Sequence, residues 1–125
     1  MSLKTQDLFD VSNKVVVVTG GSRGIGEMIT SGFLANNSKV YITARKEEAL
    51  VKKAEELSQK YSCQCIPISG DISNSEGIDA LVNFLSDAEP KGIDYLINNA
   101  GAAWGANYDD FPESGWDKVI NLNLK

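Results

Sequence analysis

Apolar and polar residues follow two different periods along this chain. Residues 14–19 (Lys-Val-Val-Val-Val-Thr) form a continuous β-branched run, which is typical of a strand buried on both faces of a parallel sheet. Shorter apolar runs predict further strands at 39–43, 64–69 and 95–97. The segments between these runs have helical spacing, so strand and helix alternate from residue 14 onward.

Four helices are predicted. The first covers residues 25–35, and the second is an amphipathic segment at 46–61. The third opens at Ser73, where Glu76 completes a capping box, and the last begins near Ser114. The apolar stripe of the second helix consists of Leu50, Ala54, Leu57 and Tyr61. The residues of the third helix expected to face the core are Ile78, Leu81, Val82 and Leu85.

The last helix carries one polar residue on its apolar side. Trp116, Val119 and Ile120 mark the stripe, and the next position on it is Asn123. An amide aimed at the interior needs a hydrogen-bond partner, which can be backbone, an ordered water or a catalytic group. A purely structural asparagine explains the pattern equally well.

This order of elements predicts an α/β fold, with a parallel sheet, right-handed crossovers and helices on both faces. No repeat, low-complexity tract or linker interrupts the chain. We therefore expect an N-terminal tail at residues 1–13 and one domain at 14–125.

Composition narrows the possible chemistry. The 125 residues carry a formal charge of −5 and include no histidine. The acidic balance argues against a nucleic-acid partner, because nothing concentrates Lys and Arg on one surface. Without imidazole there is no Ser-His-Asp triad, no Cys-His dyad and no His-ligated zinc. Any catalysis must use hydroxyls, amides, lysines or carboxylates.

The two cysteines indicate a reducing compartment. Cys63 and Cys65 are too close in sequence for an unstrained disulfide and too few for a metal site, so we expect two small buried hydrophobic residues. The polar N-terminus lacks the apolar core of a signal peptide, and no apolar run approaches the roughly 20 residues of a membrane span. These features predict a cytoplasmic protein with no metal and no membrane partner.

A glycine-rich turn follows the first strand. Gly20, Gly24 and Gly26 have the spacing G-x-x-x-G-x-G, a dinucleotide-binding variant. The first glycine permits a sharp turn, the second lets backbone amides approach a pyrophosphate, and the third lets the helix pack closely on the strand. The helix N-terminus adds unpaired N–H groups and a positive dipole. The loop residues expected to bind cofactor are Gly20, Gly21, Ser22, Arg23, Gly24, Ile25 and Gly26.

A glycine-rich turn of this kind has two other interpretations. The chain lacks a Gly-Lys-Ser/Thr sequel, which excludes a nucleotide-triphosphatase loop. A tight turn without a ligand remains the alternative.

The end of the second strand indicates which dinucleotide binds. An NAD site places an Asp or Glu there, roughly 20 residues beyond the glycines, to bind the ribose 2′-hydroxyl. Here Arg45 and Lys46 occupy that end, with no acid. Arg45 can bind a 2′-phosphate bidentately, and Arg23 is within reach of the same group. We predict NADP, with solvated charges at the start of the next helix as the alternative.

Polar residues also follow the third and fourth strands. Asp71 can accept a hydrogen bond from an adenine amino group while the N–H of Ile72 donates to the ring, although a simple turn before Ser73 is the alternative. Asn98 is expected to be structural. The residues after the fourth strand expected to approach the cofactor are Asn99, Ala100 and Gly101.

In order and spacing, these motifs resemble those of the short-chain dehydrogenase/reductase family from about residue 14 to the end. The resemblance implies a doubly wound parallel sheet of the Rossmann type, of which this chain holds the first four strands with their flanking helices. It also implies an NADP-dependent oxidoreductase. Asn123, seven residues after Trp116, falls where the family keeps its catalytic asparagine, which orders a water in the proton relay.

Within the family, the chain is similar to the NADPH-dependent 3-oxoacyl (β-ketoacyl) reductases of rhamnolipid synthesis. The similarity rests on residues 103–106 (Ala-Trp-Gly-Ala) and 111–116 (Phe-Pro-Glu-Ser-Gly-Trp). It implies hydride transfer between nicotinamide and a small-molecule carbonyl, such as a 3-oxoacyl thioester. The full-length form is then expected to be a homo-oligomer.

The family's catalytic Ser and Tyr-x-x-x-Lys pair have no counterpart in this sequence. In the family that Tyr is the general acid, while the Lys lowers its pKa and binds ribose. None of the four tyrosines here has Lys four residues later: Tyr41, Tyr61, Tyr95 and Tyr108. The last helical pattern also lacks a Gly or Pro stop, so we expect the cofactor-binding half of a reductase, inactive by itself.

Two alternatives to this function remain. One is a catalytically inactive, truncated dinucleotide-binding module. The other is an interaction domain, because a fourth strand with an open edge favours dimers or aggregates.

Overall fold

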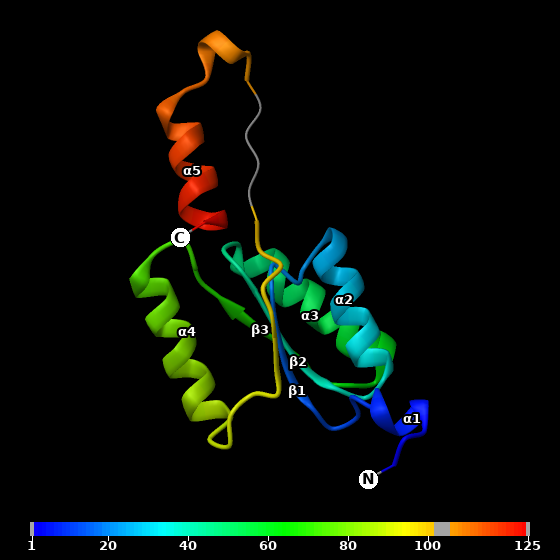
Figure 1. Cartoon of the computed structure of the whole chain (residues 1–125). Coiled ribbons are helices and arrows are strands. Elements are labelled where there is room, and N and C mark those ends of the chain that lie inside the picture. The colour runs from blue at the N-terminus through cyan, green and yellow to red at the C-terminus, as the bar shows by residue number, and fades with distance from the viewer. Residues whose placement is uncertain (1, 102–105, 125) are drawn as a thin grey trace.

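The computed structural model describes residues 2–101 and 106–124 and contains one parallel sheet, with strand order β3-β2-β1-β4. The strands are β1 (Val15–Thr19), β2 (Lys39–Ala44), β3 (Cys65–Ser69) and β4 (Tyr95–Ile97). The helices are α1 (Thr5–Leu8), α2 (Gly24–Ala35), α3 (Glu47–Tyr61), α4 (Ser75–Ala88), the 3₁₀ turn η1 (Tyr108–Asp110) and α5 (Glu113–Asn123). Helices α2 and α3 cover one face of the sheet and α4 lies on the other (Figure 1). The predicted α/β architecture is confirmed.

Strand register determines where the polar ends of the strands meet. Val15 pairs with Lys39 and Val40 with Cys65, and β4 joins the other side of β1. Because all the pairings are parallel, the carboxyl ends of the four strands lie along one edge of the sheet. Each of these strands leads at that edge into a segment for which the sequence predicts cofactor contacts.

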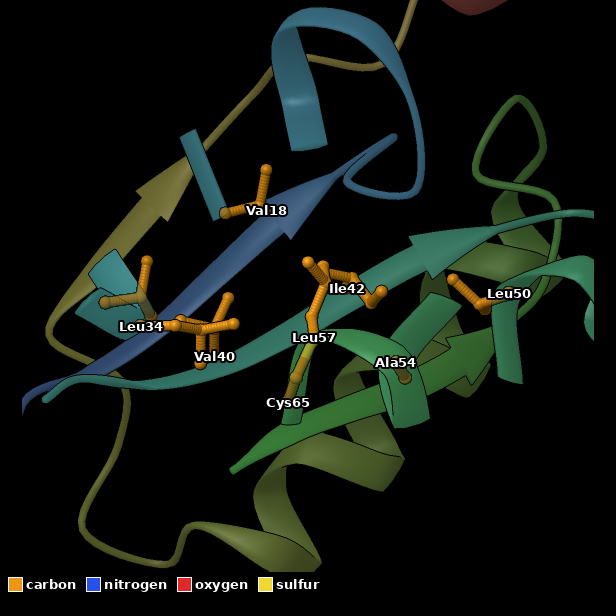
Figure 2. Close-up of a cluster of buried hydrophobic side chains, with 9 residues drawn as sticks. Val18, Leu34, Val40, Ile42, Leu50, Ala54, Leu57 and Cys65 are labelled. Atoms are coloured by element: carbon orange, nitrogen blue, oxygen red, sulfur yellow. The ribbon is translucent and has the colours of Figure 1, made fainter. Parts of the chain in front are cut away.

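The core lies between the sheet and the pair α2 and α3. Figure 2 shows side chains of β1, β2 and β3 meeting those of the two helices. The buried cluster consists of Val16, Val18, Leu34, Val40, Ile42, Leu50, Ala54, Leu57 and Cys65. The predicted apolar stripe of α3 is therefore confirmed, with Tyr61 packed at its margin.

Both cysteines are free thiols, and the expected burial is confirmed for Cys65 but not for Cys63. Cys65 is buried, and burial raises the pKa of its thiol to about 12. Cys63 is half-buried and its Sγ donates to the Ser38 carbonyl at 2.9 Å.

The predicted start of α4 is wrong. The N-cap is Asn74, whose side chain accepts a hydrogen bond from the Gly77 N–H at 2.8 Å. Ser73 instead donates its hydroxyl to the Asp71 carboxylate at 2.6 Å. A carboxylate two residues upstream is a stronger acceptor than water, so it holds Ser73 in the preceding turn and the helix begins one residue later.

The core-facing stripe of α4 is also only partly confirmed. Leu81 and Leu85 are half-buried, but Ile78 and Val82 are 43% and 53% exposed, and no residue of this helix is buried. The apolar side of α4 is wider than its contact with the sheet, because no neighbouring helix lies beside it in the described part of the chain (Figure 1).

Helix α5 does not bury the stripe expected from its periodicity. Its one buried residue is Gly115, while Trp116 is 61% exposed and Asn123 is exposed. Figure 1 shows α5 beyond the carboxyl edge of the sheet rather than over a face. Periodicity indicates that a helix has an apolar side but not what covers it.

Residues 103–105, part of the stretch on which the 3-oxoacyl reductase similarity rests, lie outside the described residues. Among the helices that the structure describes, none combines the length and apolar character needed to cross a membrane.

Candidate dinucleotide-binding site

The turn between β1 and α2 has the backbone that its glycines predict. Gly20 and Gly24 have φ values of +66° and +58°, the left-handed region that glycine adopts without steric cost. The Gly20 N–H still donates to the Thr43 carbonyl at 3.0 Å, so the turn starts as an extension of the sheet. No heavy atom of the surrounding described residues lies within 4 Å of a Cβ placed on Gly24, and its backbone is open to a ligand.

Two other glycines of the motif face the protein rather than the cleft. A Cβ on Gly26 would lie 2.0 Å from the Gly20 carbonyl oxygen and 2.5 Å from Asn99 Nδ2. A Cβ on Gly21 would lie 2.6 Å from Ile42 Cγ2. These glycines let α2 approach the sheet, which confirms the close packing expected at Gly26.

Hydrogen bonds tie the end of β4 to this turn. Thr19 Oγ1 accepts from the N–H groups of Asn99 and Ala100, at 3.0 and 3.1 Å. Asn99 Nδ2 donates to the Gly20 carbonyl at 3.1 Å. Asn99 thus joins the neighbouring strands. Asn98 is exposed, and its structural role stays a prediction. Sequence reasoning missed the part played by Thr19, whose only signal is a hydroxyl at the end of β1.

A cleft of about 470 Å³ opens at the carboxyl edge of the sheet, within the usual size range of small-molecule sites. All of the expected cofactor residues line it except Gly21, Ile25 and Gly26. Those that do are Gly20, Ser22, Arg23, Gly24, Arg45, Asp71, Ile72, Asn99, Ala100 and Gly101. The lining residues not expected from the sequence are Thr43, Ala44, Gly70 and Leu122. Sequence reasoning could have found Thr43, Ala44 and Gly70, because they stand at the carboxyl ends of β2 and β3.

The cleft offers donors for negatively charged groups. Arg23 and Arg45 are exposed at its rim, and neither forms an ion pair with another residue in 2–101 or 106–124. The N-cap residue Arg23 makes no side-chain hydrogen bond to the 12-residue helix α2, so its first N–H groups have no side-chain acceptor within the described part of the chain. The side chain of Ile25 is 70% exposed and does not line the cleft, so its expected contact with the cofactor stays a prediction. Two guanidinium groups and a helix N-terminus fit a phosphorylated ligand.

Asp71 lies in a turn before Ser73, which is the alternative to adenine binding that the sequence left open. Its Oδ1 accepts from the Ser73 hydroxyl at 2.6 Å and from the Ser73 N–H at 2.9 Å. These two hydrogen bonds, with a smaller effect from the positive charge of Arg45, hold the pKa of Asp71 below its usual range. The carboxylate is therefore an ionised acceptor at the wall of the cleft, which suits contact with an amino group.

Asn123 lies beside the cleft despite its exposure. Its Oδ1 is 3.3 Å from the position that a Cβ on Gly101 would occupy, and its neighbour Leu122 lines the cleft. Its catalytic assignment stays a prediction. The described residues contain no group of three or more Cys, Asp or Glu side chains placed to hold a metal ion.

The parallel sheet, the glycine turn and the cleft at the carboxyl edge define a dinucleotide-binding α/β fold of the Rossmann type. Residues 14–125 match the family described as short chain dehydrogenase, and the chain belongs to this family.

Relatives agree with this assignment. The chain is 42% identical over 116 residues to the rhamnolipids biosynthesis 3-oxoacyl-[acyl-carrier-protein] reductase of Pseudomonas aeruginosa, covering 93% of this chain and 44% of that protein. The RhlG/NADP active-site complex of the same species superposes with a TM-score of 0.86 at 41% identity, over 93% of this chain and 44% of that one.

A second solved structure is similar over the same extent. L-Sorbose reductase from Gluconobacter frateurii, complexed with NADPH and L-sorbose, has a TM-score of 0.83 at 30% identity and covers 93% of this chain and 44% of its own. The chain spans about half the length of the proteins it matches.

Proposed function

We propose that this chain binds NADP(H) and serves as the cofactor-binding half of a short-chain oxidoreductase that reduces a carbonyl to a secondary alcohol. The observation that carries the cofactor assignment is Arg45 at the end of β2, a rim position where an NAD site would hold an acid. Two similar solved structures contain NADP or NADPH, which supports the same assignment.

Each part of the cofactor has a matching group in the cleft. The uncapped start of α2 and the open backbone of Gly24 suit the pyrophosphate. Arg45, assisted by Arg23, suits the 2′-phosphate, because a guanidinium binds phosphate bidentately. Asp71 is an ionised acceptor for the adenine amino group. The lining residues suited to close approach to a ribose are Asn99, Ala100 and Gly101.

The reaction itself needs groups beyond this set. Bound NADPH supplies the hydride. Asn123, at the end of α5 beside the cleft, is the residue of this chain that would hold a water in the proton relay. The carbonyl oxygen also needs a proton donor, and no Tyr-x-x-x-Lys pair stands in this sequence. We therefore propose that the 125-residue chain binds cofactor without turning over substrate.

Calorimetric titration with NADP and NAD tests the cofactor assignment. The wild type should bind NADP at least tenfold more tightly than NAD. Arg45→Ala should weaken NADP binding by about tenfold to a hundredfold, because a charge-assisted hydrogen bond is worth roughly 1.5–3 kcal/mol, while NAD binding changes little. Lys52→Ala, an exposed cation on α3 that does not line the cleft, is the matched control. Equal affinity for the two dinucleotides would overturn the assignment.

Turnover tests the substrate class and the expected inactivity. We propose a 3-oxoacyl thioester, by similarity to the Pseudomonas aeruginosa reductase. The wild-type chain should not oxidise NADPH with a 3-oxoacyl substrate, although it binds NADPH. Turnover at any rate above the substrate-free background would contradict the proposed inactivity. Binding without turnover also fits a module that only holds NADP(H).

A further inference from the structure

A second, smaller hollow adjoins the cofactor cleft. It measures about 100 Å³ and is lined by Arg45, Asp71, Ser73, Lys118, Asn121 and Leu122. Arg45, Asp71 and Leu122 line both spaces, so the hollow is a side chamber of the cleft. Its walls come from the junction of β2 and α3, from the turn before α4, and from α5, whose C-terminal end lies near that turn (Figure 1).

The size of the hollow fits one phosphate group rather than a nucleoside. Ligand sites for whole small molecules measure roughly 300–1,000 Å³, whereas this hollow holds the volume of roughly three waters. It adjoins Arg45, the residue that the proposed function places on the 2′-phosphate.

The chemistry of the walls favours an anion. Arg45 and Lys118 supply two cationic side chains, and Asn121 supplies an amide that can donate. The opposing charge is Asp71, whose Oδ1 already accepts two hydrogen bonds from Ser73. Among the described lining residues there are two cations and one carboxylate, and that carboxylate accepts hydrogen bonds inside its own turn.

We propose that Lys118 is a second cationic ligand of the cofactor 2′-phosphate, acting from α5 opposite Arg45. This inference rests on the proposed binding of NADP(H) and assigns its phosphate subsite to two elements far apart in the sequence. A 2′-phosphate held between Arg45 and Lys118 links α5 to the edge of the sheet. NAD has only a hydroxyl at that position and forms no such link. Selectivity for NADP then depends on α5 as well as on the first strands.

Binding of paired ligands isolates the effect of Lys118. Lys118→Ala should weaken NADP and 2′,5′-ADP binding by about tenfold and change NAD and 5′-ADP binding by less than twofold, since only the first pair carries the 2′-phosphate. Lys118→Arg should retain most of the NADP affinity. Lys52→Ala, which removes an equal charge from α3, should leave the ratio of the NADP and NAD affinities unchanged. The melting temperatures of the wild type and Lys118→Ala, measured beside the affinities, separate a loss of phosphate binding from a loss of folding.

Hydrogen exchange gives a second readout that is independent of affinity. At saturation, NADP should protect amides of α5 more than NAD does in the wild type, and Lys118→Ala should remove that difference. If the wild type prefers NADP through Arg45 while Lys118→Ala leaves both the affinity ratio and the protection unchanged, this inference fails and the proposed function stands. If the wild type shows no preference for NADP at all, the proposed function fails first.

Discussion

The two faces of the sheet are held to their helices in different ways. On the side of α2 and α3, a continuous apolar cluster joins sheet and helices, and residues such as Leu34 and Leu50 are fully buried. On the other side, Val17 and Tyr41 of the sheet are buried, yet α4 has no buried residue of its own. Its aromatic contact is the edge-to-face pair Phe84 and Tyr41, with ring centres 6.3 Å apart.

Polar contacts at the C-terminal end of α4 join it to the sheet where apolar burial does not. The hydrogen bond at its start, from the Gly77 N–H to Asn74, caps the helix from within. At its end, Glu89 accepts from Lys39 Nζ at 2.7 Å and from the Tyr41 hydroxyl at 2.5 Å. Apolar burial is non-directional and resists changes in charge, whereas these contacts depend on ionisation and geometry. The two faces should therefore respond to different perturbations.

A cavity in the α2 and α3 face should have the largest effect. Leu50→Ala removes a fully buried side chain from the cluster and should lower the free energy of unfolding by about 2–5 kcal/mol. Leu85→Ala makes the same change at a half-buried position of α4 and should lower it by about 1 kcal/mol. Urea denaturation measures both, and equal losses would show that the two faces are packed alike.

Breaking the Glu89 contact should have an intermediate effect, on the α4 side only. Glu89→Gln keeps the shape but removes the charge that Lys39 and Tyr41 share, and should lower the free energy of unfolding by about 1–2 kcal/mol. Asp87→Asn changes an exposed carboxylate on the same helix and should have almost no effect. A loss for Asp87→Asn equal to that for Glu89→Gln would mean that only net charge matters.

The pH dependence of this contact follows from three shifted groups. Hydrogen bonds from Lys39 and then Tyr41 lower the pKa of Glu89, so its contribution to stability is present above the ordinary glutamate range and is lost as pH falls through the lowered pKa. The hydrogen bond with Glu89 raises the pKa of Lys39, and burial followed by the same carboxylate raises that of Tyr41. Their contributions are lost at alkaline pH. The stability difference between wild type and Glu89→Gln should be constant near neutral pH and shrink in strong acid.

The smallest effect is expected on the outer side of α4. Val82 is 53% exposed, so Val82→Ala loses little burial and gains helix propensity. The free energy of unfolding should change by less than about 0.5 kcal/mol. Thermal unfolding of Val82→Ala and Leu85→Ala would show where the contact between α4 and the sheet ends. A large loss of stability for Val82→Ala would mean that Val82 packs more closely against the protein than its exposed fraction indicates.

Local sequence signals predicted the elements and most of the cleft wall. The β-branched run became β1, and the glycines of the turn adopted the left-handed backbone that their spacing implies, because period and φ preference are properties of a few neighbouring residues. The N-cap of α4 was mispredicted because Ser73 and Asn74 are both good caps and a third residue, Asp71, took the hydroxyl of the first.

Sites formed between distant elements could not be predicted in this way. The exposure of Trp116 depends on where α5 comes to lie, and a helical period has the same form whether or not a neighbour covers it. Lys118 carries no motif at all, and only its place beside Arg45 in the side chamber suggests a role.

The sequence by itself determined the alternation of strands and helices, the glycine turn and the cationic end of β2, because each is encoded within a short stretch of chain. Tertiary structure decided which distant groups meet: Thr19 with the N–H of Asn99, 80 residues away, and Lys39 with Glu89, 50 residues away. It also decided that apolar packing joins one face of the sheet to its helices, while hydrogen bonds from Lys39 and Tyr41 to Glu89 hold the C-terminal end of α4 to the other face. Such pairings depend on the direction in which whole elements pack, and no local pattern of residues specifies that direction.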